Sequence, residues 1–313
     1  MIRNIKDRYY GNISLKKIKM KFKTNLLSRK MFGIISLALL FVSCNVKENK
    51  VLIIGIDGCR PDSFIKANTP SSDSLMKTGA YTFNAKTDEI SSSGICWTGM
   101  LTGVWHDKHK VVTNSYKNPN IGEYPHFFRR VKQFNPELKT YSVIQWTAIH
   151  KILQEGDADV VKTFGNDDLV TDEVVRNLTN EDVDVIFVQL DDVDHAGHKY
   201  DYVPESENYI QAVEKADSQI GRMVNALKKR ENYKNENWLV IVSTDHGGSN
   251  FGHGQNIPEH TTIFYIASGE NATRGEITEQ VNVVDVCITA MKHLGMEIKE
   301  EWSLDGKVVG LIN

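Results

Sequence analysis

"VLIIGID", residues 51 to 57, is a continuous apolar run with β-branched residues that ends on an acid. Such a run suits a strand that is buried on both faces of a sheet. Similar runs recur at "TYSVIQW" (140–146), "VDVIFVQL" (183–190), "NWLVIVST" (237–244) and "TTIFYIAS" (261–268). The sequence therefore predicts a series of buried strands.

Helical patterns lie between these strands. Over residues 205–232, apolar residues recur at spacings of three and four: Ile210, Val213, Ala216, Ile220, Met223 and Leu227. Residues 283–295 form a second such pattern, with Gly295 placed as a C-terminal cap. Strands that alternate with helices predict an α/β fold with a mostly parallel central sheet and helices on both faces. We expect one domain over residues 51–313, because no repeat or low-complexity linker interrupts it.

Charge is distributed unevenly along the 313 residues. Residues 1–30 hold ten of the 37 Lys and Arg residues and one of the 40 acidic residues, and residues 31–43 carry no charge. The remainder has 27 basic and 39 acidic residues, a net charge of −12. A segment this acidic lacks the clustered Lys and Arg residues that contact nucleic-acid phosphates, so we expect no nucleic-acid binding.

The basic segment 1–30, here called the basic head, is followed by "MFGIISLALLFVSCN". The apolar part of this stretch is shorter than the roughly 20 residues of a transmembrane helix. It has the length of a signal-peptide core, and a buried core helix is the alternative. Ser43 before Cys44 resembles a bacterial lipobox, although Phe41 stands where Leu is usual. We therefore expect a signal peptide over residues 1–43, with Met20 as an alternative start. A lipidated tether over 44–50 would then anchor an exported periplasmic or cell-surface protein to the membrane through Cys44.

The remaining cysteines are Cys59, Cys96 and Cys287. Their odd number and wide spacing predict neither a disulfide framework nor a cysteine zinc site. Any metal in this protein must therefore use Asp and His ligands.

Acids and histidines follow three of the predicted strands. Asp57 ends the first, Asp194 and His198 follow the strand at 183–190, and Asp245 and His246 follow the strand at 237–244. Chemistry in such sheets gathers beyond the carboxyl ends of the strands. Carboxylates that converge there would repel one another unless cations lay among them. The sequence therefore predicts a metal site at this edge.

Other polar residues in these loops are weaker candidates. His253 follows in the glycine-rich stretch "STDHGGSNFGHG" (243–254) and is a further good metal ligand. Asp191, Asp192 and His195 are expected to support the ligands, because neighbours in sequence tend to point apart. Arg60 either steadies a substrate anion or makes a surface ion pair.

Five motifs in this order resemble the alkaline phosphatase superfamily, specifically its type I phosphodiesterase/nucleotide pyrophosphatase branch. They are "IDG", "SSSGICWTGMLTG", "DDVDHAGH", "STDHGG" and "HG". The helix that contains "ADSQIG" and the ending "LGMEIKEEWSLDGK" are similar to that branch as well. The resemblance covers nearly all of the chain after the predicted tether.

The resemblance implies two divalent metal ions, zinc in the family. One is held by Asp57, Asp245 and His246 together with the nucleophile. The other is held by Asp194, His198 and the His of "HG", which is His253 here, with His260 as the rival.

The resemblance also implies a nucleophile in "SSSGICWTGMLTG", ten residues before Gly103, which is Ser93. Ser92 is the alternate, and a plain helix cap is the structural alternative. A hydroxyl at a helix start suits the role, because backbone N–H groups and the helix dipole favour negative charge there. Asn114 matches a family Asn that hydrogen-bonds a phosphoryl oxygen. Cys96 lacks the Arg of the sulfatase motif and is expected to be a packed thiol.

The implied activity is hydrolysis of a small phosphate ester, a phosphodiester or pyrophosphate, through a phosphoserine on Ser93. The lack of a second motif-linked cation beside Arg60 favours diesters. The alternatives are a phosphomonoesterase, phosphonate hydrolase, sulfatase or cofactor-independent mutase on the same fold, and a non-catalytic metal-binding surface lipoprotein.

Overall fold

The computed structural model describes residues 47–312. The predicted signal peptide (1–43), the alternative start Met20 and the lipidation site Cys44 lie outside the described residues. Within the described part, no helix combines the length and apolar character that crossing a membrane requires.

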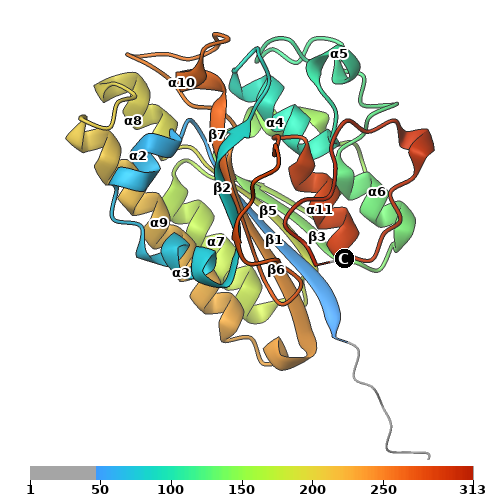
Figure 1. Cartoon of the computed structure of the whole chain (residues 1–313). Helices are drawn as coiled ribbons and strands as arrows, with labels where there is room; N and C mark the ends of the chain where they lie inside the picture. The colour runs from blue at the N-terminus through green and yellow to red at the C-terminus, as the bar shows by residue number, and fades with distance from the viewer. Residues whose placement is uncertain (1–46, 313) are drawn as a thin grey trace, which may run out of the picture. The chain divides into compact units, whose positions relative to one another are not determined.

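One sheet organises residues 47–312, with strand order β4-β3-β5-β1-β6-β7-β2-β8 (Figure 1). Its strands are β1 (Glu48–Ile56), β2 (Gly79–Lys86), β3 (Thr140–Ile144), β4 (Val160–Thr163), β5 (Val185–Leu190), β6 (Glu236–Thr244), β7 (Thr262–Ser268) and β8 (Gly275–Glu276). Strands β4, β3, β5, β1 and β6 pair in parallel, whereas β7 pairs antiparallel with both β6 and β2. The mostly parallel sheet is confirmed, and the predicted strands are β1, β3, β5, β6 and β7.

Helices cover both faces of the sheet (Figure 1). They are α2 (Pro61–Lys66), α3 (Pro70–Thr78), α4 (Ser93–Thr102), α5 (His106–His109), α6 (Phe127–Phe134), α7 (Asp167–Asn180), α8 (Asp192–Tyr200), α9 (Glu207–Lys228), α10 (Pro258–Thr261) and α11 (Asp285–His293), with 3₁₀ turns at Thr147–Ile152, Tyr233–Asn235 and Glu300–Trp302. The two predicted helices are α9 and α11. Gly295 follows α11 with φ +84°, the left-handed conformation expected of a C-terminal cap.

Successive residues of β1 point into two separate cores, which explains its unbroken apolar run. Val51 and Ile53 pack with residues of α4, α6 and α11. Leu52, Ile54 and Ile56 pack with residues of α2, α3, α7, α8 and α9. A strand with helices on both faces has no solvent side, so its sequence cannot alternate between apolar and polar residues.

The sequence did not reveal β2, β4, β8 or the reversed direction of β7. Strand β4 has no fully buried residue, and β8 is two residues long and exposed. Their apolar signal is therefore weak. Buried parallel and antiparallel strands have similar compositions, so the sequence of β7 does not show its direction. That direction depends on the path of the loop that precedes the strand.

Candidate active site

Three adjacent strands bring the predicted ligands to one edge of the sheet. Strand β1 lies between β5 and β6, and Ile56 pairs with both Leu190 and Thr244 at the ends of those strands. Asp57 and Asp245 come directly after β1 and β6, and Asp194 lies in the first turn of α8, just after β5. The convergence that the sequence predicted is therefore present in the fold.

Asp57, Asp245 and His246 form the first group of candidate metal ligands. The three side chains are buried, and His246 Nε2 lies 3.4 Å from Asp57 Oδ1 and 3.5 Å from Asp245 Oδ2. The other ring nitrogen, Nδ1, donates to the carbonyl oxygen of Gly247 at 2.8 Å. In the neutral ring Nε2 is then a bare acceptor that faces two carboxylate oxygens.

This first group fits a divalent cation. Within residues 47–312, Asp57 Oδ1 and Asp245 Oδ2 are buried without a hydrogen-bond partner. Burial and the nearby Asp194 charge raise the pKa of both carboxyls, and Asp57 and Asp245 also repel each other. Burial lowers the pKa of His246 to about 3, so its ring is neutral at physiological pH. Two carboxylate oxygens without hydrogen-bond partners that face a neutral histidine nitrogen are a typical donor set for a metal ion, and a bound cation would offset the repulsion between the carboxylates.

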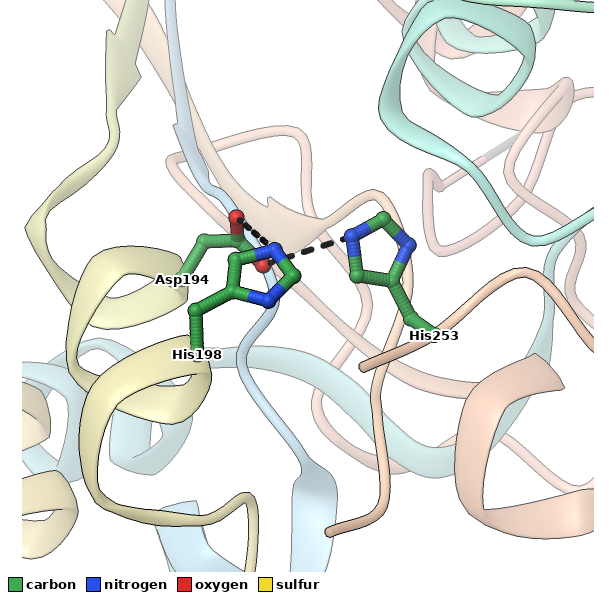
Figure 2. Close-up of side chains that lie close together, drawn as sticks. All are labelled: Asp194, His198 and His253. Atoms are coloured by element: carbon green, nitrogen blue, oxygen red, sulfur yellow. Dashed lines mark ion pairs between the residues drawn. The ribbon is translucent and has the colours of Figure 1, made fainter. Parts of the chain in front are cut away.

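Asp194, His198 and His253 form the second group (Figure 2). Asp194 Oδ2 lies 3.3 Å from His198 Nε2, and Asp194 Oδ1 lies 3.9 Å from His253 Nε2. The Nδ1 atoms donate to backbone carbonyls, that of His198 to Phe251 at 2.9 Å and that of His253 to Ser91 at 3.0 Å. All three histidines thus direct Nε2 towards carboxylates while a backbone carbonyl holds Nδ1–H, as is usual for metal-binding histidines.

The two groups adjoin each other. The rings of His246 and His253 stack with centroids 3.9 Å apart. The hydrogen bond to Asp194 raises the pKa of His198 to about 9, so without a metal a proton holds this pair together. A divalent cation would replace that proton.

Ser93 is the hydroxyl that the fold brings to the ligands. It is the first residue of α4, and its Oγ lies 3.1 Å from His246 Nε2. The alternate, Ser92, is the N-cap residue and its side chain makes no capping bond. Asn114 lies beside the same helix end, where its Oδ1 accepts from the backbone N–H of Gly94 at 2.9 Å. The predicted nucleophile and the predicted phosphoryl-binding amide are therefore neighbours.

His260 and Arg60 are occupied elsewhere. His260 Nε2 pairs with Ser249 Oγ at 2.7 Å and Nδ1 accepts from the Gln255 N–H at 3.1 Å, so His253 is the His that joins the second group. The guanidinium of Arg60 pairs with Asp62 and donates to the carbonyls of Tyr202 and Gly248. The structure thus contains the ion pair that was the sequence-based alternative for Arg60.

The neighbours of Asp194 lie outside both groups, as expected. Asp191 pairs with His195 at 3.1 Å, and Asp192 pairs with Lys215 at 3.1 Å. Cys96 is fully buried, and burial raises the pKa of its thiol well above the ordinary value. It is a packed thiol and carries no exposed nucleophile.

Three supporting residues escaped the sequence analysis. Trp97 Nε1 donates to Asp57 Oδ2 at 2.8 Å, Gln189 Nε2 donates to the same oxygen at 3.1 Å, and the Tyr202 hydroxyl donates to Asp194 Oδ1. Gln189 is the one polar residue of β5, which is a usable signal. Trp97 lies one helical turn after Ser93, whereas nothing in the sequence marks Tyr202.

A cavity of about 790 Å³ lies beside the site. Its lining includes the aromatic rings of Trp146 and Phe164 and the polar side chains of Lys151, Asp191 and His195. The ring of Tyr116 connects it to the nucleophile helix. That ring lies 6.2 Å from the ring of Trp146, and a Cβ at Gly94 would approach it to 3.2 Å. The Tyr116 ring therefore lies between Trp146 in the cavity wall and the start of the helix that carries Ser93.

The chain is similar to known proteins in sequence and in fold. Human ectonucleotide pyrophosphatase/phosphodiesterase family member 7 is 24% identical over 226 residues, which are 64% of this chain and 48% of that protein. The chain spans about half the length of this human protein and of its rat and mouse counterparts. The structure of murine ectonucleotide pyrophosphatase/phosphodiesterase 5 in complex with AMP superposes with a TM-score of 0.66 at 13% identity, covering 80% of this chain and 96% of that one. A 2-O GAG sulfatase superposes with a TM-score of 0.67 at 13% identity, covering 84% and 73%.

The sheet, the two ligand groups and these likenesses define an α/β protein of the alkaline-phosphatase-like class. The chain belongs to the type I phosphodiesterase/nucleotide pyrophosphatase family, whose model matches residues 51–146 and 130–264. The resemblance on the five motifs is thereby confirmed.

Proposed function

We propose that this protein is a metal-dependent hydrolase that cleaves phosphodiester or pyrophosphate bonds through a phosphoserine on Ser93. One observation carries the proposal. The Ser93 hydroxyl lies 3.1 Å from a histidine nitrogen that itself faces two buried, unpartnered carboxylate oxygens. A hydroxyl in that position is close enough to share whatever cation these atoms hold. The names of the family and of its relatives support the reaction class.

Two ions have ligands in this arrangement. Asp57, Asp245 and His246 would hold one with Ser93, and Asp194, His198 and His253 would hold the other. Bound there, two divalent cations, zinc by the family resemblance, would supply positive charge that favours the ionised serine and offsets charge on the phosphoryl oxygens.

The chain's own groups account for binding and attack. The positive end of the α4 dipole favours an incoming phosphate. The N–H of Gly94 is bonded to Asn114, and those of Ile95 and Cys96 are bonded to the Ser92 carbonyl. The Asn114 amide donates to a phosphoryl oxygen, since its Oδ1 is already held by Gly94. Ser93 Oγ gives its proton to water and bonds to phosphorus as the bond to the leaving oxygen breaks, and that oxygen takes a proton back from water. A water molecule then cleaves the phosphoserine and restores the hydroxyl.

The site favours a substrate with a single negative charge at phosphorus. A dianionic monoester benefits from an additional cation, and Arg60 is committed to Asp62 and two carbonyl oxygens. The sulfatase alternative draws on the similar fold of the 2-O GAG sulfatase. Against it stands the buried Cys96, which cannot present a modified nucleophile to substrate.

The test is a panel of three chromogenic substrates with zinc-loaded protein: bis-p-nitrophenyl phosphate, p-nitrophenyl phosphate and p-nitrophenyl sulfate. We expect the diester to have the highest kcat/KM. Preferential hydrolysis of the sulfate or the monoester would replace the diesterase proposal. Two bound zinc ions without turnover of any of them would favour the non-catalytic lipoprotein.

We also propose that the catalytic domain covers residues 51–313 and is exported as a lipoprotein. The basic head, the short apolar run and Cys44 support the anchor, and the placement would be periplasmic or at the cell surface. The substrate would then be a small phosphate ester met outside the cytoplasm.

A further inference from the structure

Gln189 is a buried polar residue at the centre of the site. It lies in β5 between Val188 and Leu190, and its side chain is fully buried. A side-chain amide has two N–H donors and an oxygen with two lone pairs, and a buried amide is costly unless these are used. The Gln189 amide uses all four, two on each side.

The N–H groups of Gln189 face the acids of the site. Nε2 donates to Asp57 Oδ2 at 3.1 Å and to Asp191 Oδ1 at 2.9 Å. Trp97 donates to the same Asp57 oxygen at 2.8 Å. Because Oδ2 is held by two donors, the carboxylate of Asp57 cannot rotate freely. Its other oxygen, Oδ1, is left without a partner and faces His246.

The carbonyl oxygen of the same amide faces the backbone of two residues that line the cavity. Oε1 accepts from the backbone N–H groups of Gln145 at 3.1 Å and Trp146 at 2.9 Å. These residues follow the end of β3. The N–H of Gln145 also donates to the backbone carbonyl of Gln189 at 3.3 Å, so the side chain and backbone of Gln189 both hold this turn. Gln145 and Trp146 line the 790 Å³ cavity, so Gln189 is bonded directly to this part of its wall.

We propose that Gln189 is a positioning residue that couples the first metal group to the substrate cavity. Its N–H side orients Asp57 for the ion, and its carbonyl side fixes the turn that presents Trp146 to the organic part of the substrate. The second half of this statement rests on the proposed function, because it takes the cavity as the substrate's binding site. The first half concerns metal binding alone.

Two variants separate the two halves. Gln189→Met keeps the length of the side chain and removes all four hydrogen bonds, whereas Trp97→Phe removes one bond to Asp57 and leaves the cavity wall intact. Isothermal titration of each metal-free protein with zinc tests the metal half, the orientation of Asp57 for the ion, and requires no turnover. We expect both variants to bind one of two zinc equivalents about 10–100-fold more weakly, the usual effect of losing a group that orients a metal ligand. The other equivalent should stay within error of wild type.

The cavity half, the role of Gln189 in placing Trp146, is tested by measuring KM for bis-p-nitrophenyl phosphate at saturating zinc. We expect Trp97→Phe to recover the wild-type KM, whereas Gln189→Met should keep a KM several-fold higher. If the protein hydrolyses no ester, the proposed function fails, and the zinc titration still decides the metal half.

Gln219→Met is the matched control. Gln219 is also a buried glutamine, but it lies on α9 and its Nε2 donates to Asp168 outside both ligand groups. This control should bind zinc and substrate as wild type does, and thermal melts of the metal-free proteins should show all three variants folded. Wild-type zinc affinity in Gln189→Met would overturn the proposal. Equal weakening of both zinc equivalents would overturn it as well, because it would indicate a general loss of structure.

Discussion

Removing the Ser93 hydroxyl should abolish turnover and leave the rest of the site in place. Ser93→Ala deletes one atom whose only described side-chain hydrogen bond is to His246. The loss of one such bond costs about 1 kcal/mol or less, so the melting temperature should change by only a few degrees. The bond that holds Asn114 uses the backbone N–H of Gly94 and survives the substitution.

The catalytic effect should be far larger than the effect on stability. Loss of an activated nucleophile costs a factor on the order of a thousand or more in turnover, which is about 4 kcal/mol of barrier. All six side chains of the two ligand groups remain, so zinc content should stay near two per chain. Substrate affinity should be unchanged or tighter, because no serine charge then opposes the phosphate.

The assay measures kcat and KM for bis-p-nitrophenyl phosphate together with the zinc content of the same sample. Ser92→Ala is the control, since it removes the neighbouring hydroxyl, which makes no capping bond. It should keep nearly full activity. A loss of tenfold or less in Ser93→Ala, with zinc retained, would refute the reasoning. Water would then attack phosphorus directly, and Ser93 would only cap the helix.

Further predictions address metal, acidity and anchoring. Asp245→Ala and His198→Ala should each bind about one zinc instead of two by elemental analysis, and unchanged content in both would contradict the ligand assignment. Hydrogen bonds from Arg176 and Lys162 lower the pKa of Glu173 to about 2, so its stabilising effect is complete above about pH 4.5 and is lost as the pH falls towards 2. Urea unfolding should therefore find Glu173→Gln less stable than wild type at pH 7 by more than at pH 3; an equal difference at both would exclude this effect. Cys44→Ser should lose membrane association and detergent partitioning, and an unprocessed protein that stays in the membrane fraction would contradict the lipoprotein proposal.

The sequence alone determined the fold class and most of the candidate ligands. Unbroken apolar runs that alternate with helical periodicity required a sheet covered on both faces, because no other arrangement buries them. The carboxyl ends of parallel strands lie at one edge, which brings Asp57, Asp194 and Asp245 together. Motif order added Ser93, Asn114 and the preference for His253.

Only the tertiary structure decided which polar groups meet. Trp97 and Gln189 bond Asp57 from 40 and 132 positions away. Tyr202, which lies just beyond the end of α8, donates back to Asp194. The sequence left open whether Arg60 binds a substrate anion or forms an ion pair. In the fold its guanidinium pairs with Asp62, and the carbonyls of Tyr202 and Gly248 accept its other hydrogen bonds. Periodicity records which face of an element is buried, because burial acts on each residue separately. A hydrogen bond depends on the distance and angle between two particular atoms, and those are defined only when the whole chain has packed.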